Sequence, residues 1–410
     1  MEKTKIPEIG IKPLVEGGHP FVYTKEKKVL PFSFFDEACF TQPKAEDEKK
    51  NSITPTYLTL EVLNKPKVFS EAAIYEGFER QSNGDLKLTN EDLLKKQKGI
   101  LVDVIKKAAK QLFEGKNVVG LSLPVRIFHA RSTIERICDI FSLAPHYLNA
   151  AFMEEGVERL KQSMGFLIAG LPLAICQWKP FNPLLGETYQ GKLPDGTTID
   201  AEHISHHPPI TAYMVVNKNW KIHGSFTYNG KIGTNLFNAF NEGWGTIEFA
   251  DGEILKFTTP SLSLKGMMMG TRKIQYITSL VIANEVTRTK GVIKFNAEAK
   301  GGLTGFFKSS RQDSVKGAIY KYEKVMHNKT KANPSWFAMI KEFAEMKDCV
   351  EEIEPIEGSW LDEITVGGKT LWNIKEAEKL ATPHYFIDTP LPSDARYRED
   401  VIWLAREDAN

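Results

Sequence analysis

Lysine, asparagine and histidine side chains gather in one stretch of the chain, residues 178–213. Lys179 and Asn182 stand near its beginning, and the paired imidazoles of His206 and His207 stand near its end. All four side chains donate hydrogen bonds, and two of them can become charged near neutral pH. A site built from such donors suits a phosphorylated ligand better than a proton-transfer reaction.

The histidines also allow other interpretations. His203, His206 and His207 with Glu202 carry metal-ligating groups, but their spacing is H-x-x-H-H and not the helical H-E-x-x-H. In a strand, consecutive side chains point to opposite faces, so one zinc ion would need a bend in the chain. By residue type alone, imidazoles that merely hydrogen-bond to backbone at a strand end are the commoner case. We therefore predict no metal site.

Two segments of this stretch resemble known motifs. Residues 201–209, AEHISHHPP, resemble the EQVSHHPP fingerprint of the oxysterol-binding-protein family, and residues 179–187, KPFNPLLGE, resemble the second motif of that family. Their order and the gap between them match as well. Two positions depart from the fingerprint, with His203 in place of glutamine and Ile204 in place of valine. Whether His203 tunes the pocket or faces solvent stays open at this point.

The resemblance implies that Lys179, Asn182, His206 and His207 hold the 4-phosphate of phosphatidylinositol 4-phosphate. A phosphomonoester carries close to two negative charges, and each charge-assisted hydrogen bond contributes about 1.5–3 kcal/mol. No cofactor is implied; the bound ligand would be a sterol or phosphatidylinositol 4-phosphate. The family also uses a lysine, a glutamate and an arginine on a C-terminal helix. The sequence ends at Asn410 without them, so the completeness of the headgroup site stays open.

The bulk composition is that of a soluble globular protein, with 410 residues, 42% hydrophobic and 26% charged. A net charge of +1 gives no global attraction to nucleic acid. The four cysteines form no C-x-x-C pair and are expected to be reduced. No apolar run has the length of a signal region or a spanning helix. We expect a cytoplasmic monomer that contacts membrane surfaces transiently and binds no nucleic acid.

A helix is predicted over residues 97–113, where apolar residues recur at three- and four-residue spacing and lysines occupy the other faces. An ordinary surface helix would have this pattern. In the family that the sequence resembles, a helix at this position is a lid over the tunnel, which buries its apolar face on cargo or offers it to lipid. The lid residues would be Ile100, Leu101, Val104, Ile105 and Ala108.

The remaining pattern predicts an α+β fold that is mainly β. Two helices are expected over 132–169, the first opened by a Ser132–Glu135 capping box and the second spanning about 147–169. Short alternating runs over about 183–325, broken at Asp195–Gly196, Asn229–Gly230 and Asp251–Gly252, predict antiparallel strands. They would form a large incomplete β-barrel around an apolar tunnel. A C-terminal subdomain, 326–410, would contain a helix over 333–351, a hairpin over 358–372 and a final helix.

Residues 1–95 are expected to be an N-terminal extension that packs on the lipid-binding domain, residues 96–410. Within it, residues 33–39 resemble the FFAT motif, which docks to a receptor of the endoplasmic reticulum. The acidic flank of that motif is missing, and two outer positions differ. A buried Phe-Phe pair is the interpretation that we favour.

Together these features predict a lipid-transfer protein and not an enzyme. It would carry a sterol or another lipid in its tunnel and exchange it for phosphatidylinositol 4-phosphate between membranes. The alternative is a lipid-responsive sensor or membrane-contact tether without net transfer. A hydrolase is least supported, because the sequence has no nucleophile elbow, no H-E-x-x-H and no clear carboxylate pair.

Overall fold

The computed structural model describes residues 10–13, 20–23, 78–88, 106, 125, 128–175, 179–233, 235–266, 270–296, 311–323, 348–381 and 384–408. The chain divides into two compact units, Met1–Glu61 and Val62–Asn410. In the first unit, β1 (Gly10–Pro13) and β2 (Pro20–Tyr23) form an antiparallel hairpin. The second unit contains both motifs.

Some of the predicted features lie outside the described residues. They are the FFAT-like segment 33–39 and the lid residues Ile100, Leu101, Val104, Ile105 and Ala108. Most of the helix predicted over 333–351 also lies outside them.

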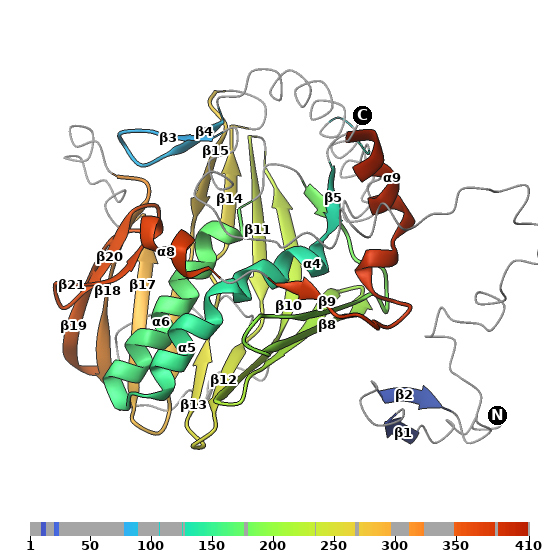
Figure 1. Cartoon of the computed structure of the whole chain (residues 1–410). Coiled ribbons are helices and arrows are strands. Elements are labelled where there is room, and N and C mark those ends of the chain that lie inside the picture. The colour runs from blue at the N-terminus through green and yellow to red at the C-terminus, as the bar shows by residue number, and fades with distance from the viewer. Residues whose placement is uncertain are drawn as a thin grey trace, which may run out of the picture. The chain divides into compact units, whose positions relative to one another are not determined.

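An antiparallel sheet that curves into an incomplete barrel is the main feature of the described part of the second unit (Figure 1). Its strands are β3 (Phe78–Arg80), β4 (Leu86–Leu88), β7 (Thr188–Lys192), β8 (Thr198–His206), β9 (Pro209–Val216), β10 (Trp220–Ile232), β11 (Leu236–Glu242), β12 (Gly245–Phe249), β13 (Ile254–Phe257), β14 (Leu262–Lys265), β15 (Lys273–Tyr276), β16 (Ser279–Asn284), β17 (Thr289–Phe295), β18 (Ser314–Tyr322), β19 (Cys349–Ser359), β20 (Glu363–Val366), β21 (Lys369–Asn373) and β22 (Tyr385–Phe386).

The long strand β10 organises the order of this sheet. On one side it pairs with β9, which continues through β8 and β7 to β22. On the other side its first half pairs with β12 and its second half with β11. β12 leads through β13, β16, β17, β18, β19 and β20 to β21, whereas β11 leads through β14 and β15 to β4 and β3. Among the described strands, β21 pairs with β20 and β22 pairs with β7, and no hydrogen-bonded pairing joins β21 to β22. The barrel is therefore incomplete. The predicted fold class is confirmed.

Alternating burial explains why these segments form strands. In β12 every second residue is buried, namely Gly245, Ile247 and Phe249, so one face of the strand turns to the core. The predicted turns at Asp195–Gly196 and Asp251–Gly252 are confirmed, with Gly196 at φ +89° and Gly252 at φ +93°. The turn predicted at Asn229–Gly230 is wrong, because β10 continues through both residues and pairs there with β11.

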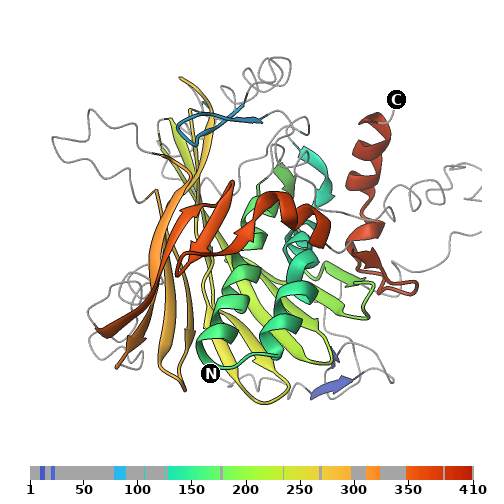
Figure 2. The ribbon, with the colours of Figure 1, turned by 60° about the vertical axis from the view of Figure 1, so that its left-hand side comes forward.

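A helical layer lies against the concave face of the sheet (Figure 1, Figure 2). It consists of α4 (Thr133–Cys138), the 3-10 helix η4 (Asp139–Leu143), α5 (Ala144–Phe152) and α6 (Gly156–Leu173). The second predicted helix, 147–169, is broken between α5 and α6, where Glu155 is extended and Gly156 adopts φ +57°. A residue other than glycine would be strained at such a φ, which explains the break.

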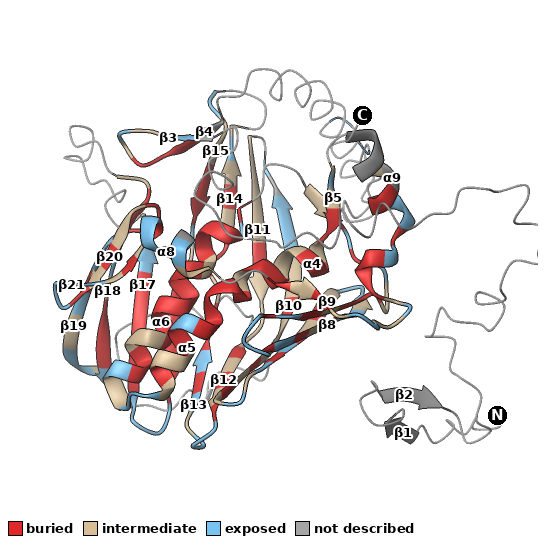
Figure 3. Cartoon of the chain, viewed as in Figure 1, coloured by how far each residue is buried: buried red, intermediate tan, exposed pale blue. Residues whose placement is uncertain are grey.

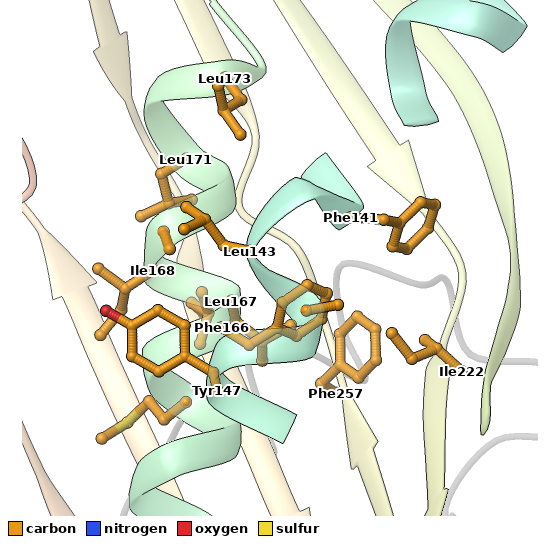
Figure 4. Packing of buried hydrophobic residues seen from close by; sticks show 14 of the residues in the cluster. Phe141, Leu143, Tyr147, Phe166, Leu167, Ile168, Leu171, Leu173, Ile222 and Phe257 are labelled. Atoms are coloured by element: carbon orange, nitrogen blue, oxygen red, sulfur yellow. The ribbon is translucent and has the colours of Figure 1, made fainter. Parts of the chain in front are cut away.

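The core lies between this helical layer and the inner face of the sheet (Figure 3). Figure 4 shows Phe166 and Leu167 on α6, with Phe257 and Ile222 supplied by the strands. The ring of Phe166 stacks with that of Phe141 of η4, with centres 6.4 Å apart. Each of these side chains is buried. Among the helices that the structure describes, none combines the length and hydrophobicity that crossing a bilayer requires.

The C-terminal part of the chain joins the barrel wall. The helix predicted over 333–351 is wrong at its end, because residues 349–351 belong to β19, which pairs with β18 over its length. The hairpin predicted over 358–372 is confirmed for β20 and β21, whereas residues 358–359 at the start of the predicted range belong to β19. After it come α8 (Ile374–Leu380), the 3-10 helix η7 (Ala395–Tyr397) and the final helix α9 (Glu399–Asp408). Two further short strands, β5 (Phe128–Ser132) and β6 (Lys179–Phe181), pair in parallel beside the helices.

Candidate functional site

The first two candidate residues, Lys179 and Asn182, are in direct contact. The pairing of β5 with β6 places Phe128 opposite Lys179. The Lys179 ammonium lies 4.9 Å from the centre of the Phe128 ring, and that ring stacks on Phe181 with centres 4.6 Å apart. Lys179 Nζ also donates to the side-chain oxygen of Asn182. A cation and an amide are thus held together over an aromatic face.

A buried ion pair fixes the turn that follows Asn182. The Glu187 carboxylate accepts hydrogen bonds from Leu184 N at 2.7 Å, from Arg398 Nη1 at 2.9 Å and from the Ser132 hydroxyl. Arg398 Nη1 donates in addition to the Asn182 carbonyl oxygen at 2.6 Å. Burial raises the pKa of Glu187, and the charge of Arg398 opposes that shift without cancelling it. Both ends of the turn are therefore tied to the same two side chains.

The role of Ser132 differs from the prediction. Helix α4 begins at Thr133, but the Ser132 side chain makes no cap hydrogen bond. Its hydroxyl donates to Glu187, while Glu135 accepts from Arg131 Nε at 2.9 Å. The predicted capping box is therefore wrong, because Ser132 binds the distant Glu187 and Glu135 binds Arg131.

The second pair of candidates, His206 and His207, lies at the tip of the hairpin between β8 and β9, where His206 pairs with Pro209. Both imidazoles are exposed, and their ring centres lie 4.9 Å apart at an interplanar angle of 75°. The two nitrogen-bearing rings are therefore adjacent and accessible from solvent.

Backbone hydrogen bonds join the two motifs. Gly186 N donates to His203 O at 2.9 Å, and His203 N donates to Glu187 O at 2.9 Å. The end of the second motif thus runs beside the strand that leads to His206 and His207. The structure brings Lys179 and Asn182 together as one pair, His206 and His207 as another, and ties the segments that carry the two pairs to each other.

His203 does not face solvent. It is 1% exposed, and its Nδ1 lies 3.1 Å from Thr211 Oγ1. Its Nε2 lies 3.4 Å from His206 Nδ1. Of the two alternatives that the sequence left open, the solvent-facing one is wrong.

An apolar cavity of about 250 Å³ lies between the helical layer and the sheet. Most of its lining is hydrocarbon or aromatic surface, and Tyr213 and Phe226 stack on its wall with ring centres 4.6 Å apart. The main lining residues are Ile137, Ile140, Phe141, Phe166, Leu167, Leu171, Tyr213, Phe226, Tyr228, Ala239, Phe240, Phe257, Leu262, Tyr276 and Leu280. The bore of the barrel is therefore not completely filled by the described side chains.

The cavity reaches the second motif. Pro180, which follows Lys179 in the chain, is among its lining residues, as is Thr133, whose hydroxyl donates to Phe181 O at 2.9 Å. The lining also includes polar Asn241, whose Nδ2 donates to Thr259 Oγ1 at 2.8 Å. The cavity lining thus includes the chain neighbour of Lys179, while Lys179, Asn182, His206 and His207 are not among the lining residues.

Sequence reasoning missed Arg398 and the partners of Glu187. Glu187 lies within the second motif, but nothing in the sequence places Arg398 beside it, because 211 positions separate the two residues. The described residues contain no group of three His, Cys, Asp or Glu side chains that could hold a metal ion.

Comparison with known proteins identifies the family. The family model described as "Oxysterol-binding protein" matches residues 107–409. The Dictyostelium discoideum protein "Oxysterol-binding protein 9" is 31% identical over 346 residues, which cover 81% of this chain and 76% of that protein. The human "Oxysterol-binding protein-related protein 5" is 28% identical over 229 residues, covering 53% of this chain but 25% of its own length.

Solved structures share the fold. The Osh3 ORD of Saccharomyces cerevisiae, crystallised with PI(4)P, superimposes with a TM-score of 0.54 at 22% identity and covers 74% of this chain and 78% of that one. The Osh1 ORD domain, crystallised with ergosterol, gives 0.52 at 20% identity and covers 72% and 71%. The chain belongs to the oxysterol-binding protein family.

Proposed function

We propose that this protein carries one lipid molecule in its barrel and exchanges a sterol or another lipid for phosphatidylinositol 4-phosphate between membranes. Lys179, Asn182, His206 and His207 would bind the 4-phosphate, and the cavity would take the apolar part of the lipid. No covalent step is required. Two related structures, one in complex with PI(4)P and one in complex with ergosterol, support this choice of lipids.

The observation that supports the proposal is that the lining of the apolar cavity and the candidate donors meet in the chain at Pro180. Pro180 lines the cavity, and its neighbour Lys179 contacts Asn182. A phosphoinositide needs both surfaces at once, because its acyl chains must leave water while its phosphate must keep hydrogen-bond partners. Burial of acyl or sterol surface stabilises the complex by about 25 cal/mol per Å². A site for a free anion would not need the apolar chamber.

The test is a transfer assay between vesicles with the double variant His206→Ala/His207→Ala. Donor vesicles contain phosphatidylinositol 4-phosphate and acceptor vesicles contain cholesterol, both in phosphatidylcholine. The variant should lose phosphoinositide transfer and retain cholesterol binding and the fold. A matched control is His146→Ala/His223→Ala, which removes two histidines that do not line the cavity or belong to either motif. Undiminished phosphoinositide transfer by the first variant would refute the site.

A lipid sensor or tether remains the second candidate, because the same geometry would bind a lipid without releasing it. The two functions differ in turnover. A carrier moves many lipid molecules per protein molecule, whereas a sensor binds stoichiometrically. Transfer that stops after one lipid per protein would favour the sensor.

The lid over 97–113 and peripheral contact with membranes are further parts of the proposal. The lid would close over bound lipid and offer its apolar face to a bilayer when open. A chain lacking residues 97–113 should transfer lipid more slowly and adhere more to vesicles; normal transfer would dismiss the lid.

A further inference from the structure

His203 is a buried, chemically versatile side chain to which the proposed function gives no role. Its position follows from the alternation of β8, in which Ile199, Ala201 and His203 are buried and face the interior. A histidine in such a row leaves two ring nitrogens to be satisfied, and each is placed against a polar atom.

A bulge brings His206 to the same side of the sheet as His203. In a regular strand, residues three positions apart point to opposite faces. Here His203 is opposite Thr211 and Ser205 is opposite Ile210, so Ile204 is an extra residue in β8. One inserted residue reverses the alternation beyond it. The two rings therefore meet edge to face, with centres 5.6 Å apart at 89°.

The contacts form one line of polar atoms. Thr211 Oγ1 lies 3.1 Å from His203 Nδ1, and His203 Nε2 lies 3.4 Å from His206 Nδ1. Because Nδ1 of His206 faces His203, Nε2 is the nitrogen of the exposed His206 ring that remains for a ligand. Thr211 is fully buried, which anchors the inner end of the line.

We propose that His203 is a positioning residue, which holds the ring of His206 through Nδ1 so that His206 presents Nε2 to the phosphate. The assignment of that phosphate rests on the proposed function; the ring contact itself does not.

The proton arrangement is consistent in both states of His206. When His206 is neutral, the Thr211 hydroxyl donates to His203 Nδ1, His203 Nε2–H donates to His206 Nδ1, and His206 Nε2–H donates to the ligand. When His206 is charged, its Nδ1–H donates to His203 Nε2, and His203 Nδ1–H donates to Thr211. His203 stays neutral throughout and only changes tautomer.

The surroundings of His203 favour that neutral form. Burial lowers the pKa of His203 to about 4, and the neighbouring charge of His206 acts in the same direction. His206 is the titratable side chain in contact with His203. The other contact, Thr211 on the adjacent strand, has a hydroxyl that does not ionise near neutral pH. A neutral imidazole can accept or donate, whereas a charged one would repel a charged His206.

The test compares the full chain with His203→Gln and His203→Leu. Glutamine, the residue of the family fingerprint, has an oxygen to accept from His206 and an amide to donate, whereas leucine can do neither. We expect His203→Leu to weaken binding of inositol 1,4-bisphosphate roughly tenfold in calorimetry, and His203→Gln to restore most of the affinity. Equal affinity of the wild type and His203→Leu would overturn the proposal.

A nuclear magnetic resonance measurement separates positioning from packing. With ¹⁵N-labelled histidine, inositol 1,4-bisphosphate should shift the ring-nitrogen signals of His203 in the wild type, and the shift should disappear in His206→Ala. Thr211→Val, which keeps the shape of the side chain, should also change the ring signals of His203 and serves if His203→Leu does not fold. Absence of a His203 response in a protein that binds the ligand overturns the proposal.

Failure of the proposed function gives a different result. If the wild type does not bind inositol 1,4-bisphosphate, the phosphate assignment fails. The ring contact is then judged without ligand, by whether His203→Leu moves the Nδ1 signal of His206 more than His203→Gln does. An unmoved signal would overturn the positioning role as well.

Discussion

Arg398 and Glu187 form a buried ion pair, with Nη1 2.9 Å from Oε2, between residues 211 positions apart in the chain. The same Nη1 binds the carbonyl oxygen of Asn182 at 2.6 Å. Through these two bonds the segment before α9 fixes the turn that carries one of the candidate phosphate ligands. The geometry of the proposed headgroup site would therefore depend on the C-terminal segment as well as on the two motifs.

Replacing Arg398 with methionine should lower the free energy of unfolding by about 3–5 kcal/mol, because Glu187 would remain buried without its partner. It should also weaken binding of inositol 1,4-bisphosphate, since the Asn182 turn loses its clamp. Urea denaturation and calorimetry measure the two effects. The double variant Glu187→Gln/Arg398→Met should be less destabilised than the single one.

Arg396→Met is the matched control for that prediction. Arg396 is buried in the same segment and pairs with Asp394 at 3.2 Å. Its terminal nitrogens donate to the carbonyl oxygens of Ile387 and Gln190 instead of to that of Asn182. Its loss should cost stability and leave ligand affinity unchanged. Equal losses of affinity in both variants would contradict a specific clamp.

Asp139 should govern the loss of stability in acid. Burial alone would raise the pKa of Asp139, but bonds of 2.8 Å from each terminal nitrogen of Arg131, a bond from His384 at 2.8 Å and the charge of Arg136 hold it well below its usual value. A folded-state pKa below the unfolded one contributes stability above about pH 4, and this contribution disappears as the pH falls further. Asp139→Asn should therefore lower the free energy of unfolding at pH 7. It should also make that free energy fall less steeply as the pH drops below about 4.

Urea denaturation across a pH series measures this effect. Asp388→Asn is the control, because the Asp388 side chain is 93% exposed and its contact with Lys192 is 3.9 Å long. Its curve should follow the wild type. If the unfolding free energy of Asp139→Asn fell as steeply in acid as that of the wild type, the ion pair would not be the cause of the acid-induced loss of stability.

Several of these features were readable from the sequence and others were not. Alternation predicted strands such as β12 and β13, which pair with a neighbour close in the chain. The turns at Gly196 and Gly252 were predicted because both need a positive φ, which glycine tolerates. The quoted motifs identified Lys179, Asn182, His206 and His207 as candidates, and the structure places each pair in contact.

The remaining features depend on long-range contacts. Ser132 has the sequence of a helix cap, yet its hydroxyl binds Glu187, which a local pattern cannot reveal. The Asn229–Gly230 dipeptide favours a turn by itself, but pairing with β11 extends the strand through it. The bulge at Ile204 has no local signature, and without it His203 would face away from His206. Tertiary contacts overrode the local preference at each of these positions.

The neutral state of His203 should appear in the pH dependence of stability. Its pKa falls from 6.5 to about 4 in the folded chain, mainly through burial. Between these values the unfolded chain binds more protons, so stability rises with pH across that window and is lost as the pH falls through it. His203→Gln should reduce the dependence of the unfolding free energy on pH between pH 6.5 and pH 4. An unchanged slope would mean that His203 does not titrate as its surroundings predict.

Filling the cavity should separate lipid uptake from headgroup recognition. Ala239 lines the cavity from β11, and a phenylalanine there would occupy much of the space of about 250 Å³. Ala239→Phe should lose binding of cholesterol from phosphatidylcholine vesicles. It should keep its affinity for inositol 1,4-bisphosphate, because the candidate phosphate ligands at 179, 182, 206 and 207 are unchanged. The matched control is Val216→Phe, which adds a ring at an exposed position of β9 and should bind cholesterol normally. Cholesterol binding by Ala239→Phe equal to that of Val216→Phe would show that the lipid does not occupy this chamber, since a ring inside it and a ring outside it would then have the same effect.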